Sequence, residues 1–403
     1  MSPKLFILAL ALMPSAALAD GHAATLGLSY GPRPAYLIDK LPEGALKDKL
    51  MSCSAQTPAR SNFSIGHRGA PMMFPEHTVE SNVAAARMGA GILECDVTFT
   101  KDHALVCRHA QNDLHTTTNI LTTDLAATCV TGFTPAQGDV DATAECRTSE
   151  LTLAQFETLI PKMDSADKTA TTAQQYQGGV ADWRTQLYTD KATSMTHAQS
   201  IAVFKSLGAK FTPELKSPSV EMPHNGFSQT DYAQKLVDEY VAAGVAASDV
   251  FVQSFNLADI EYWIDTTPEF GAQAVYLVEW TDGFDEQAPE TWVQDFAALK
   301  ARGVNYIGAS LNMLLTDENG AIAASAYAKA AWDADINLIA WTLERSGPLA
   351  QGGGWYFQSV GDIVRDDSDY LVALDVLAQD AGVVGVFSDW PATVTYYANC
   401  MGL

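Results

Sequence analysis

The chain has 403 residues, in which 24 Lys and Arg stand against 48 Asp and Glu, so the formal net charge is −24 at pH 7. This acidic balance excludes DNA, RNA and anionic membranes as expected partners, because their phosphates are bound by clustered Lys and Arg. Hydrophobic residues at 47% and aromatic residues at 9% exclude a disordered chain. The length suits one domain of about 250–350 residues with insertions, or two smaller domains.

Residues 1–19 have the pattern of a secretory signal peptide. Lys4 gives a positively charged start, an apolar run follows from Leu5 to Leu12, and a small-residue cleavage site ends at Ala19. The alternative is an uncleaved membrane anchor, but a membrane span needs about 20 apolar residues and this run is much shorter. No later segment is long and apolar enough to span a bilayer. We therefore expect an exported protein, periplasmic or secreted, without stable membrane insertion.

All cysteines follow the predicted cleavage site, and their even number in an oxidising compartment predicts disulfides. Six cysteines allow 15 connectivities, and the sequence does not choose among them. Cys129 and Cys146 flank a short polar loop and form the best local pair, while Cys53 and Cys400 are candidates for joining the two ends of the chain. A zinc site is the alternative, but no C-x-x-C or paired Cys/His spacing supports it.

After an N-terminal extension (residues 20–62), short β-like runs alternate with helix-like runs along residues 63–403. Strands are predicted at 63–66, 92–99, 105–109, 210–214, 250–254, 274–278, 304–307, 337–342 and 383–387. Helices are predicted at 78–88, 231–243, 291–301, 321–332 and 370–378. This alternation predicts an α/β fold with a TIM-like (β/α)8 barrel. The run at 105–109 follows a four-residue turn and is expected to be a hairpin arm outside the ring. A doubly wound open sheet is the competing architecture.

Residues 110–205 interrupt this alternation with a stretch rich in Thr, Ala, Asp and Gln. We interpret it as a long insertion between early barrel units, helical around 152–160. Long loops on a barrel often belong to the active-site face. A surface excursion is an equal alternative for residues 164–180.

Polar residues gather at the predicted strand ends. His67 and Arg68 follow the first strand, and a guanidinium fork fits a phosphate or carboxylate. In the second strand, side chains alternate between faces, so Glu94 and Asp96 share one face while Cys95 and Val97 share the other. Two enclosed carboxylates need a cation or a shared proton. The alternative is a solvent-facing strand with two ordinary acids.

Two later strand ends complete the set. His109 ends the 105–109 run, and Glu214 and Lys216 end the strand at 210–214. Three hard carboxylate ligands suit one divalent cation, Ca²⁺ or Mg²⁺. Two histidines beside it suit a general base and a general acid, and the cationic side chains suit an anionic substrate. The pattern predicts metal-assisted hydrolysis of a phosphate ester.

The ordered motifs resemble the glycerophosphodiester phosphodiesterase family. The resemblance is carried by residues 67–70 (HRGA), 75–78 (PEHT), 94–97 (ECDV), 100–102 (TKD), His109, 213–216 (PELK), 253–255 (QSF), 341–342 (WT) and 385–391 (GVFSDWP). It implies a (β/α)8 barrel that hydrolyses glycerophosphodiesters to an alcohol and glycerol 3-phosphate with a divalent cation. It also implies roles for individual residues. His67 and His109 form the acid/base pair, without a choice of which is the acid; Glu94, Asp96 and Glu214 are metal ligands; Arg68 binds the phosphate with Lys216 close by.

Several residues leave alternatives open. The family motif usually has Asn where this chain has His77. His77 is then an extra metal ligand, a pH-sensitive replacement for the Asn or a residue that supports a metal ligand, and we favour the last. Trp341 either lines the substrate pocket or fills the core, and Asp389 either braces the site or caps the last helix. His103, His197 and His224 have no partner in the pattern and are expected at the surface.

Two rival functions remain at this stage. One is a phospholipase D-like phosphodiesterase acting on lysolipid or sphingomyelin, which the acidic surface disfavours. The other is a non-catalytic exported protein that binds phosphorylated ligands. A binder needs Arg68 and Lys216 but gives no reason for two strand-end histidines beside three carboxylates.

Overall fold

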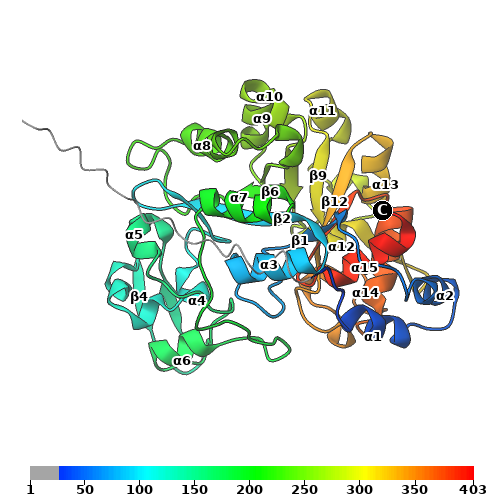
Figure 1. Ribbon diagram of the computed structural model, residues 1–403, viewed down its shortest axis with the longest axis horizontal. Helices are drawn as coiled ribbons and strands as arrows, with labels where there is room; N and C mark the ends of the chain where they lie inside the picture. Colours follow the sequence, from blue (N-terminus) through cyan, green and yellow to red (C-terminus); the bar gives the residue numbers. More distant parts are fainter. Residues whose placement is uncertain (1–26) are drawn as a thin grey trace, which may run out of the picture.

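The computed structural model describes residues 27–403, so the predicted signal peptide of residues 1–19 lies outside the described part. Nine strands form one sheet at the centre of the molecule (Figure 1). β3 (Leu105–Cys107) pairs antiparallel with β2 as a hairpin arm, as predicted. The other eight strands are parallel, and β1 pairs with both β2 and β13, which closes the ring.

The closed ring confirms the predicted (β/α)8 barrel, and the doubly wound open sheet is wrong. The ring strands are β1 (Ser61–Gly66), β2 (Ala90–Phe99), β6 (Lys210–Leu215), β7 (Gln253–Ser254), β8 (Val275–Val278), β9 (Tyr306–Ser310), β12 (Asn337–Leu343) and β13 (Gly385–Ser388).

Apolar side chains fill both the inside and the outside of this ring. A small cluster inside the barrel contains Ile65, Ile92, Val275, Leu277, Ile339 and Phe387. The larger core lies between the strands and the helices that follow them. These helices are α3 (Val79–Arg87), α7 (His197–Ser206), α8 (Gln229–Ala242), α9 (Leu257–Thr266), α10 (Pro268–Gly271), α11 (Phe296–Ala301), α12 (Leu311–Leu314), α13 (Ala326–Asp333), α14 (Asp369–Asp375) and α15 (Ala392–Met401).

The two ends of the described chain lie together. Helices α1 (Arg33–Lys40) and α2 (Ala45–Ser52) lie beside α14 and α15 (Figure 1). A disulfide joins Cys53 to Cys400 across 347 residues. The candidate pairing of these two cysteines is therefore confirmed.

Most of the stretch between β3 and α7 has a hydrophobic core of its own. It contains α4 (Leu114–Thr117), β4 (Thr131–Thr134), β5 (Thr143–Glu145), α5 (Leu153–Phe156) and α6 (Ala173–Gly178), which Figure 1 shows to one side of the barrel. Its buried apolar residues include Leu121, Phe156 and Tyr176, and the Cys129–Cys146 disulfide closes its hairpin. The stretch ends in α7, which packs against β2, β3 and β6 as a barrel helix.

Two predicted helices and one predicted surface residue differ from the structure. Residues 321–324 form β11 (Ala321–Ala324), paired with β10 (Leu315–Glu318), because Asn319 and Gly320 adopt the positive φ angles of a tight hairpin turn. The helix predicted from 291 begins only at Phe296. His197 is fully buried and bonds to Glu239, so its predicted surface position is wrong.

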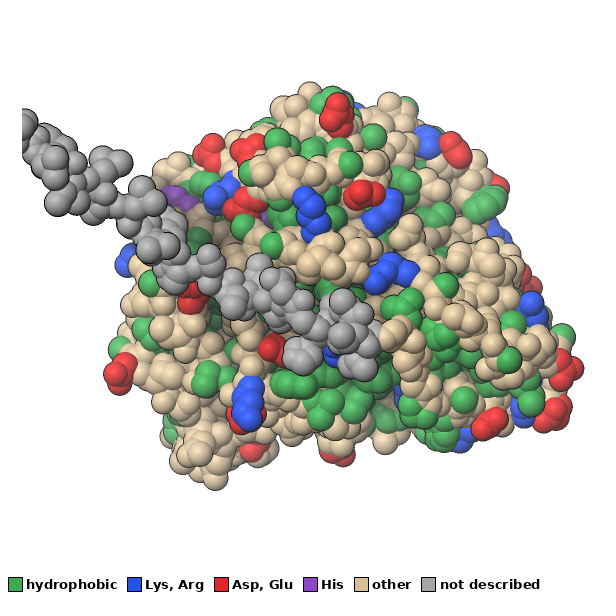
Figure 2. All heavy atoms as spheres, viewed as in Figure 1, with side chains coloured by type: hydrophobic (Ala, Val, Ile, Leu, Met, Phe, Trp, Pro, Cys, Tyr) green, Lys and Arg blue, Asp and Glu red, His purple; other side chains and the backbone are tan. Residues whose placement is uncertain are grey.

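Two properties of the described residues bear on the expected partners: whether any helix could span a bilayer, and whether Lys and Arg form a stripe on the face that Figure 2 shows. None of the helices in residues 27–403 has the length and apolar character needed to cross a membrane. In Figure 2, Lys and Arg side chains are scattered among acidic ones on the visible face.

Candidate functional site

The first part of the site is a sharp turn at the end of β1. His67, Arg68 and Gly69 follow the strand directly, and both Arg68 and Gly69 have positive φ angles. A Cβ on Gly69 would lie 2.4 Å from the Ser81 hydroxyl oxygen, so the approach of this turn to α3 requires glycine. Thr78 caps α3 by accepting a hydrogen bond from the Ser81 backbone. The turn and the cap together fix His67 and Arg68 at the barrel mouth.

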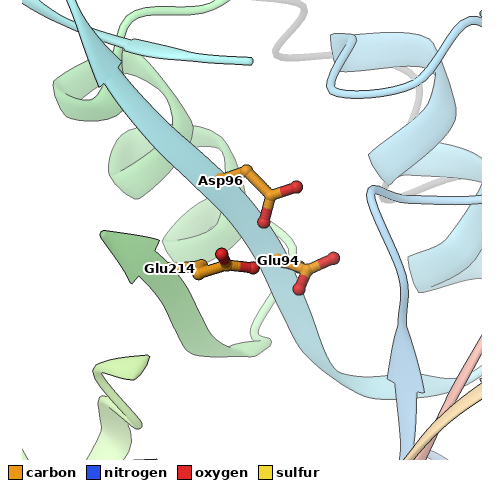
Figure 3. Close-up of side chains that lie close together, drawn as sticks. All are labelled: Glu94, Asp96 and Glu214. Carbon is orange, nitrogen blue, oxygen red and sulfur yellow. The ribbon is translucent and has the colours of Figure 1, made fainter. Parts of the chain in front are cut away.

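Three carboxylates come from two neighbouring strands. Glu94 and Asp96 lie on the inner face of β2, and the parallel register pairs Asp96 with Glu214 of β6. Figure 3 shows their carboxyl groups gathered on one side of the two strands. One oxygen from each of the three side chains lies within 4.8 Å of the others, and all three residues are buried. The predicted alternation of faces is confirmed, because Cys95 and Val97 pack in the outer core.

Neighbouring groups hold each of these carboxylates. Glu94 accepts hydrogen bonds from the Arg68 backbone N–H at 2.8 Å and from the Gln253 amide at 3.0 Å. The Lys216 ammonium lies 2.5 Å from Glu214.

Asp96 Oδ2 lies 2.9 Å from His77 Nε2. This contact supports the favoured interpretation of His77 as a support for a ligand. Asp96 Oδ1 is buried and has no hydrogen-bond partner among residues 27–403.

The electrostatics of this group favour a bound cation. Burial and the negative charge of Asp96 raise the pKa of Glu94 well above its ordinary value. Burial raises the pKa of Glu214 to about 7, although Lys216 opposes that shift. Three enclosed carboxylates thus repel one another, and one buried oxygen is unpaired. Because hard oxygen ligands in such a cluster suit Ca²⁺ or Mg²⁺, these residues fit a divalent cation.

His67 is held by a carboxylate from the far end of the chain. Its Nδ1 lies 2.6 Å from Asp389 Oδ1, which is fully buried after β13. Asp389 does not cap the last helix, since the N-cap residue of α15 is Pro391 and no side chain caps the helix. Its contact with His67 supports the bracing interpretation. Burial, followed by the positive charges of Arg68 and Arg345, holds the pKa of His67 well below its usual value. The imidazole is therefore neutral at neutral pH.

His109 reaches the same cavity from the β2–β3 hairpin. It is half-buried, two residues beyond the end of β3, and makes no hydrogen bond to another residue of the described chain. Burial and the charges of Arg68 and Lys216 hold its pKa well below the usual value. Both histidines thus line one cavity as neutral imidazoles.

Positive side chains balance part of the negative charge. Arg68 lies 2.9 Å from Glu76 and 3.4 Å from Asp96. Arg345, which follows β12, contacts Glu76 at 3.2 Å and Asp389 at 3.3 Å. Its third partner is Asp164 at 2.8 Å, in the stretch between β3 and α7. This network connects the barrel mouth to that stretch.

The cavity has a volume of about 750 Å³, which suits a small organic ligand. Every predicted site residue except Asp96 lines it, and an oxygen of Asp96 lies within 4.8 Å of an oxygen of each of the two lining carboxylates, Glu94 and Glu214. Trp341 lines the cavity and packs against Phe255, Trp355 and Tyr356 with ring centroids within 6 Å. Trp341 thus lines the pocket and also packs against the apolar cluster inside the barrel, so neither interpretation of this residue excludes the other.

Sequence reasoning assigned no role to several residues of this site. Glu76 stands in a quoted motif, and its position just before α3 is the signal that points to it. Arg345 and Asp164 have no local pattern that marks them, and they lie 181 residues from each other in the sequence. Gln253 begins β7 beside Glu214, which only the strand register shows.

Comparisons with known proteins agree with this geometry. Residues 67–393 match the model of the "Glycerophosphoryl diester phosphodiesterase family". An "Extracellular protein" of Arthroderma benhamiae is 41% identical over 249 residues, which are 60% of this chain and all of the relative. A "Probable glycerophosphodiester phosphodiesterase 1" of Mycobacterium tuberculosis is 41% identical over 59 residues, 15% of this chain and 22% of that protein. The crystal structure of "Putative glycerophosphoryl diester phosphodiesterase" from Silicibacter pomeroyi superposes with a TM-score of 0.56 at 15% identity, covering 87% of this chain and 98% of the other.

Proposed function

Because the chain belongs to the glycerophosphoryl diester phosphodiesterase family and is thus a phosphoric diester hydrolase, we propose that it cleaves glycerophosphodiesters by acid–base catalysis beside a divalent cation. The products are an alcohol and glycerol 3-phosphate. The observation that carries this proposal is the buried triad of Glu94, Asp96 and Glu214, which lies with His67 and His109 at one barrel mouth. A passive binding site has no need of two neutral imidazoles beside three carboxylates.

The carboxylates hold the cation, and the chain's cationic groups hold the anionic part of the substrate. Glu94, Asp96 and Glu214 are the ligands, and the bound Ca²⁺ or Mg²⁺ supplies positive charge against which a phosphoryl oxygen is stabilised. Arg68 and Lys216 line the same cavity and are placed to bind the phosphate. A guanidinium fork fits two phosphate oxygens, which orients the diester for attack.

His67 acts as the general base. A neutral imidazole that donates Nδ1–H to Asp389 leaves Nε2 as the acceptor, so the tautomer is fixed by the 2.6 Å hydrogen bond. Nε2 then takes the proton from the attacking hydroxyl or water.

His109 acts as the general acid and protonates the leaving alcohol. Burial lowers its pKa first, followed by the charges of Arg68 and Lys216, and a bound phosphodiester offsets those charges and favours the imidazolium. The aromatic wall around Trp341 packs against the carbon skeleton of the glycerol or the head group.

We also propose that the protein works outside the cytoplasm. Two observations support this: the predicted signal peptide of residues 1–19, and the similarity to the "Extracellular protein" of Arthroderma benhamiae. All six cysteines are in disulfides, which persist in oxidising compartments.

The test is turnover of glycerophosphocholine and glycerophosphoethanolamine by the purified protein with Ca²⁺, with Mg²⁺ and with chelator. We expect cation-dependent release of glycerol 3-phosphate, and a loss of at least about 10³-fold with chelator. A Glu94→Gln variant should show the same loss at every cation concentration. Undiminished turnover in chelator contradicts the role of the carboxylates. Release of choline from sphingomyelin or lysolipid, with none from the two soluble diesters, contradicts the proposed substrate.

A further inference from the structure

We propose that the Cys95–Cys107 disulfide is a positioning cross-link that sets the place of His109 relative to the carboxylates of β2. The inference rests on the proposed function, since it treats His109 as the general acid. Neither cysteine touches the cavity, so both act through the residues beside them. The feature that carries the inference is where the two cysteines stand in their strands.

Cys95 lies between two of the proposed ligands. Its neighbours Glu94 and Asp96 face the barrel mouth, and Cys95 itself is buried in the core on the outer side of β2. Any shift of the Cys95 backbone therefore moves the backbone of both carboxylates. Cys107 is fully buried and lies two residues before His109. The disulfide joins these positions with a Cα–Cα distance of 5.2 Å.

The arm that carries His109 is attached as far as Arg108, and these attachments stop short of His109 itself. β3 is three residues long, and its paired register with β2 ends at Cys107 opposite Val97. Further backbone hydrogen bonds run from Arg108 N–H to the Asp96 carbonyl at 2.8 Å and from Cys107 N–H to the Met195 carbonyl at 3.0 Å. The Arg108 guanidinium donates to the Glu76 carbonyl at 2.8 Å. His109 itself makes no hydrogen bond to the rest of the described chain. Because the register of β3 with β2 stops two residues before His109, the covalent link at Cys107 adds a fixed attachment to β2 beside the residue that it positions.

The chain contains a matched disulfide with no such position. Cys129 and Cys146 close a separation of 17 residues, against 12 for Cys95 and Cys107, so the loop-entropy contribution of the two bonds is similar. Neither Cys129 nor Cys146 lines the cavity. If the Cys95–Cys107 bond only stabilised the fold, removal of either disulfide would have the same kinetic consequence.

The experiment compares the C95A/C107A and C129A/C146A variants of the full protein with wild type, using glycerophosphocholine and saturating cation. Activity is measured well below the melting temperature of each variant. For C95A/C107A we expect kcat to fall about 10- to 100-fold with KM within about threefold, because a misplacement of about 1 Å is enough for such a loss. Hydrogen exchange should become faster in residues 105–113. For C129A/C146A we expect kcat within about twofold of wild type.

The outcomes separate this inference from the proposed function. A wild-type protein without turnover overturns the proposed function, and unchanged exchange in residues 105–113 overturns the cross-link on its own. Wild-type kcat in C95A/C107A, or equal losses of kcat in both variants, also overturns the cross-link alone. Where C95A/C107A fails to fold, Cys95→Val with Cys107→Ala restores apolar volume and carries the same measurements. Failure of that variant to fold makes the bond a folding requirement and overturns the positioning role.

Discussion

The two halves of the barrel mouth have opposite character. The charged half follows β1, β2, β3 and β6 and holds His67, Arg68, Glu94, Asp96, His109, Glu214 and Lys216. The other half is formed by β7, β8, β12 and β13 and the loops after them, and we call it the apolar half. It holds Phe255, Leu277, Trp341 and Phe387, with Trp355 and Tyr356 from the loop after β12, beside only two charged lining residues, Glu279 and Arg345. Both halves line one cavity.

From this difference we infer that the charged half carries out the chemistry and the apolar half recognises the substrate. In the charged half, every group except His109 is held by a neighbour before substrate arrives, as His67 is by Asp389 and Glu94 by the Arg68 backbone. Fixed charges in a water-poor site stabilise a transition state without reorganisation. The apolar half contributes surface that carbon atoms cover. Changes in the charged half should therefore lower kcat, and changes in the apolar half should raise KM.

The largest expected effect on kcat comes from removing a proton-transfer group. His67→Ala and His109→Ala should each lower kcat about 10³-fold, because no other imidazole of the described chain lines the cavity. Steady-state kinetics with glycerophosphocholine measure this. His224→Ala is the control, since His224 packs against Phe99 outside the cavity and should keep wild-type kcat. Near-wild-type turnover in either site variant would show that its imidazole transfers no proton.

Asp389→Asn tests how far positioning alone contributes to the charged half. We expect kcat about 10²-fold lower with KM within about threefold. An asparagine amide that turns its oxygen to Arg345 donates its N–H to Nδ1, and this favours the wrong tautomer of His67. The chain offers a matched pair: His197 and Glu239 lie 2.9 Å apart outside the cavity. Glu239→Gln should lower thermal stability and leave kcat unchanged. Equal kinetic effects in the two variants would contradict a role for Asp389 in catalysis.

Much of the charged half was predictable from the sequence, because it depends on local rules. The alternation of β2 places Glu94 and Asp96 on one face, and strand ends meet at one mouth of a parallel barrel. The four-residue turn before β3 predicted the hairpin arm, and local spacing favoured the Cys129–Cys146 pair. Each of these features is decided within about twenty residues.

The contacts that the sequence did not show join distant segments. His67 and Asp389 lie 322 residues apart, and Arg345 meets Asp164 across 181 residues. Such pairs depend on how the ring closes, which no local pattern encodes. The burial of His197 was missed for the same reason, since Glu239 is in the next helix. The β10–β11 hairpin was missed although its Asn319-Gly320 turn was visible, because the apolar spacing after it also fits a helix.

A smaller effect is expected from the apolar half. Trp341→Ala should raise KM about tenfold and leave kcat within about threefold, because it removes ring surface that binds substrate and transition state alike. Trp332→Ala is the matched control, since Trp332 is 62% exposed and outside the cavity. If Trp341→Ala lowered kcat as much as Asp389→Asn, the proposed division of roles between the two halves would be contradicted.

The smallest expected effect concerns the stability cost of buried charge near His109. Asp113 lines the cavity and accepts hydrogen bonds from the Ala110 backbone at 3.0 Å and the Thr117 hydroxyl at 3.1 Å. Burial raises its pKa from 3.8 to about 6, although Arg108 opposes that shift. Between these values the folded state binds more protons than the unfolded state. The free energy of unfolding should therefore fall as pH rises through this range.

Asp113→Asn removes this titration, so its unfolding curve should lack that part of the pH dependence. The full pKa shift corresponds to about 3 kcal/mol of unfolding free energy, and solvation of the ionised site reduces this amount. Between pH 4 and about 7, we therefore expect the free energy of unfolding to fall by about 1 kcal/mol more in wild type than in the variant. Urea unfolding at closely spaced pH values measures the difference. The lost acceptor for Ala110 N–H lowers the stability of the variant equally at all pH values, so only the difference in slope is diagnostic. Parallel curves would show that Asp113 is solvated, and that the charged half carries its excess negative charge without a cost in folding.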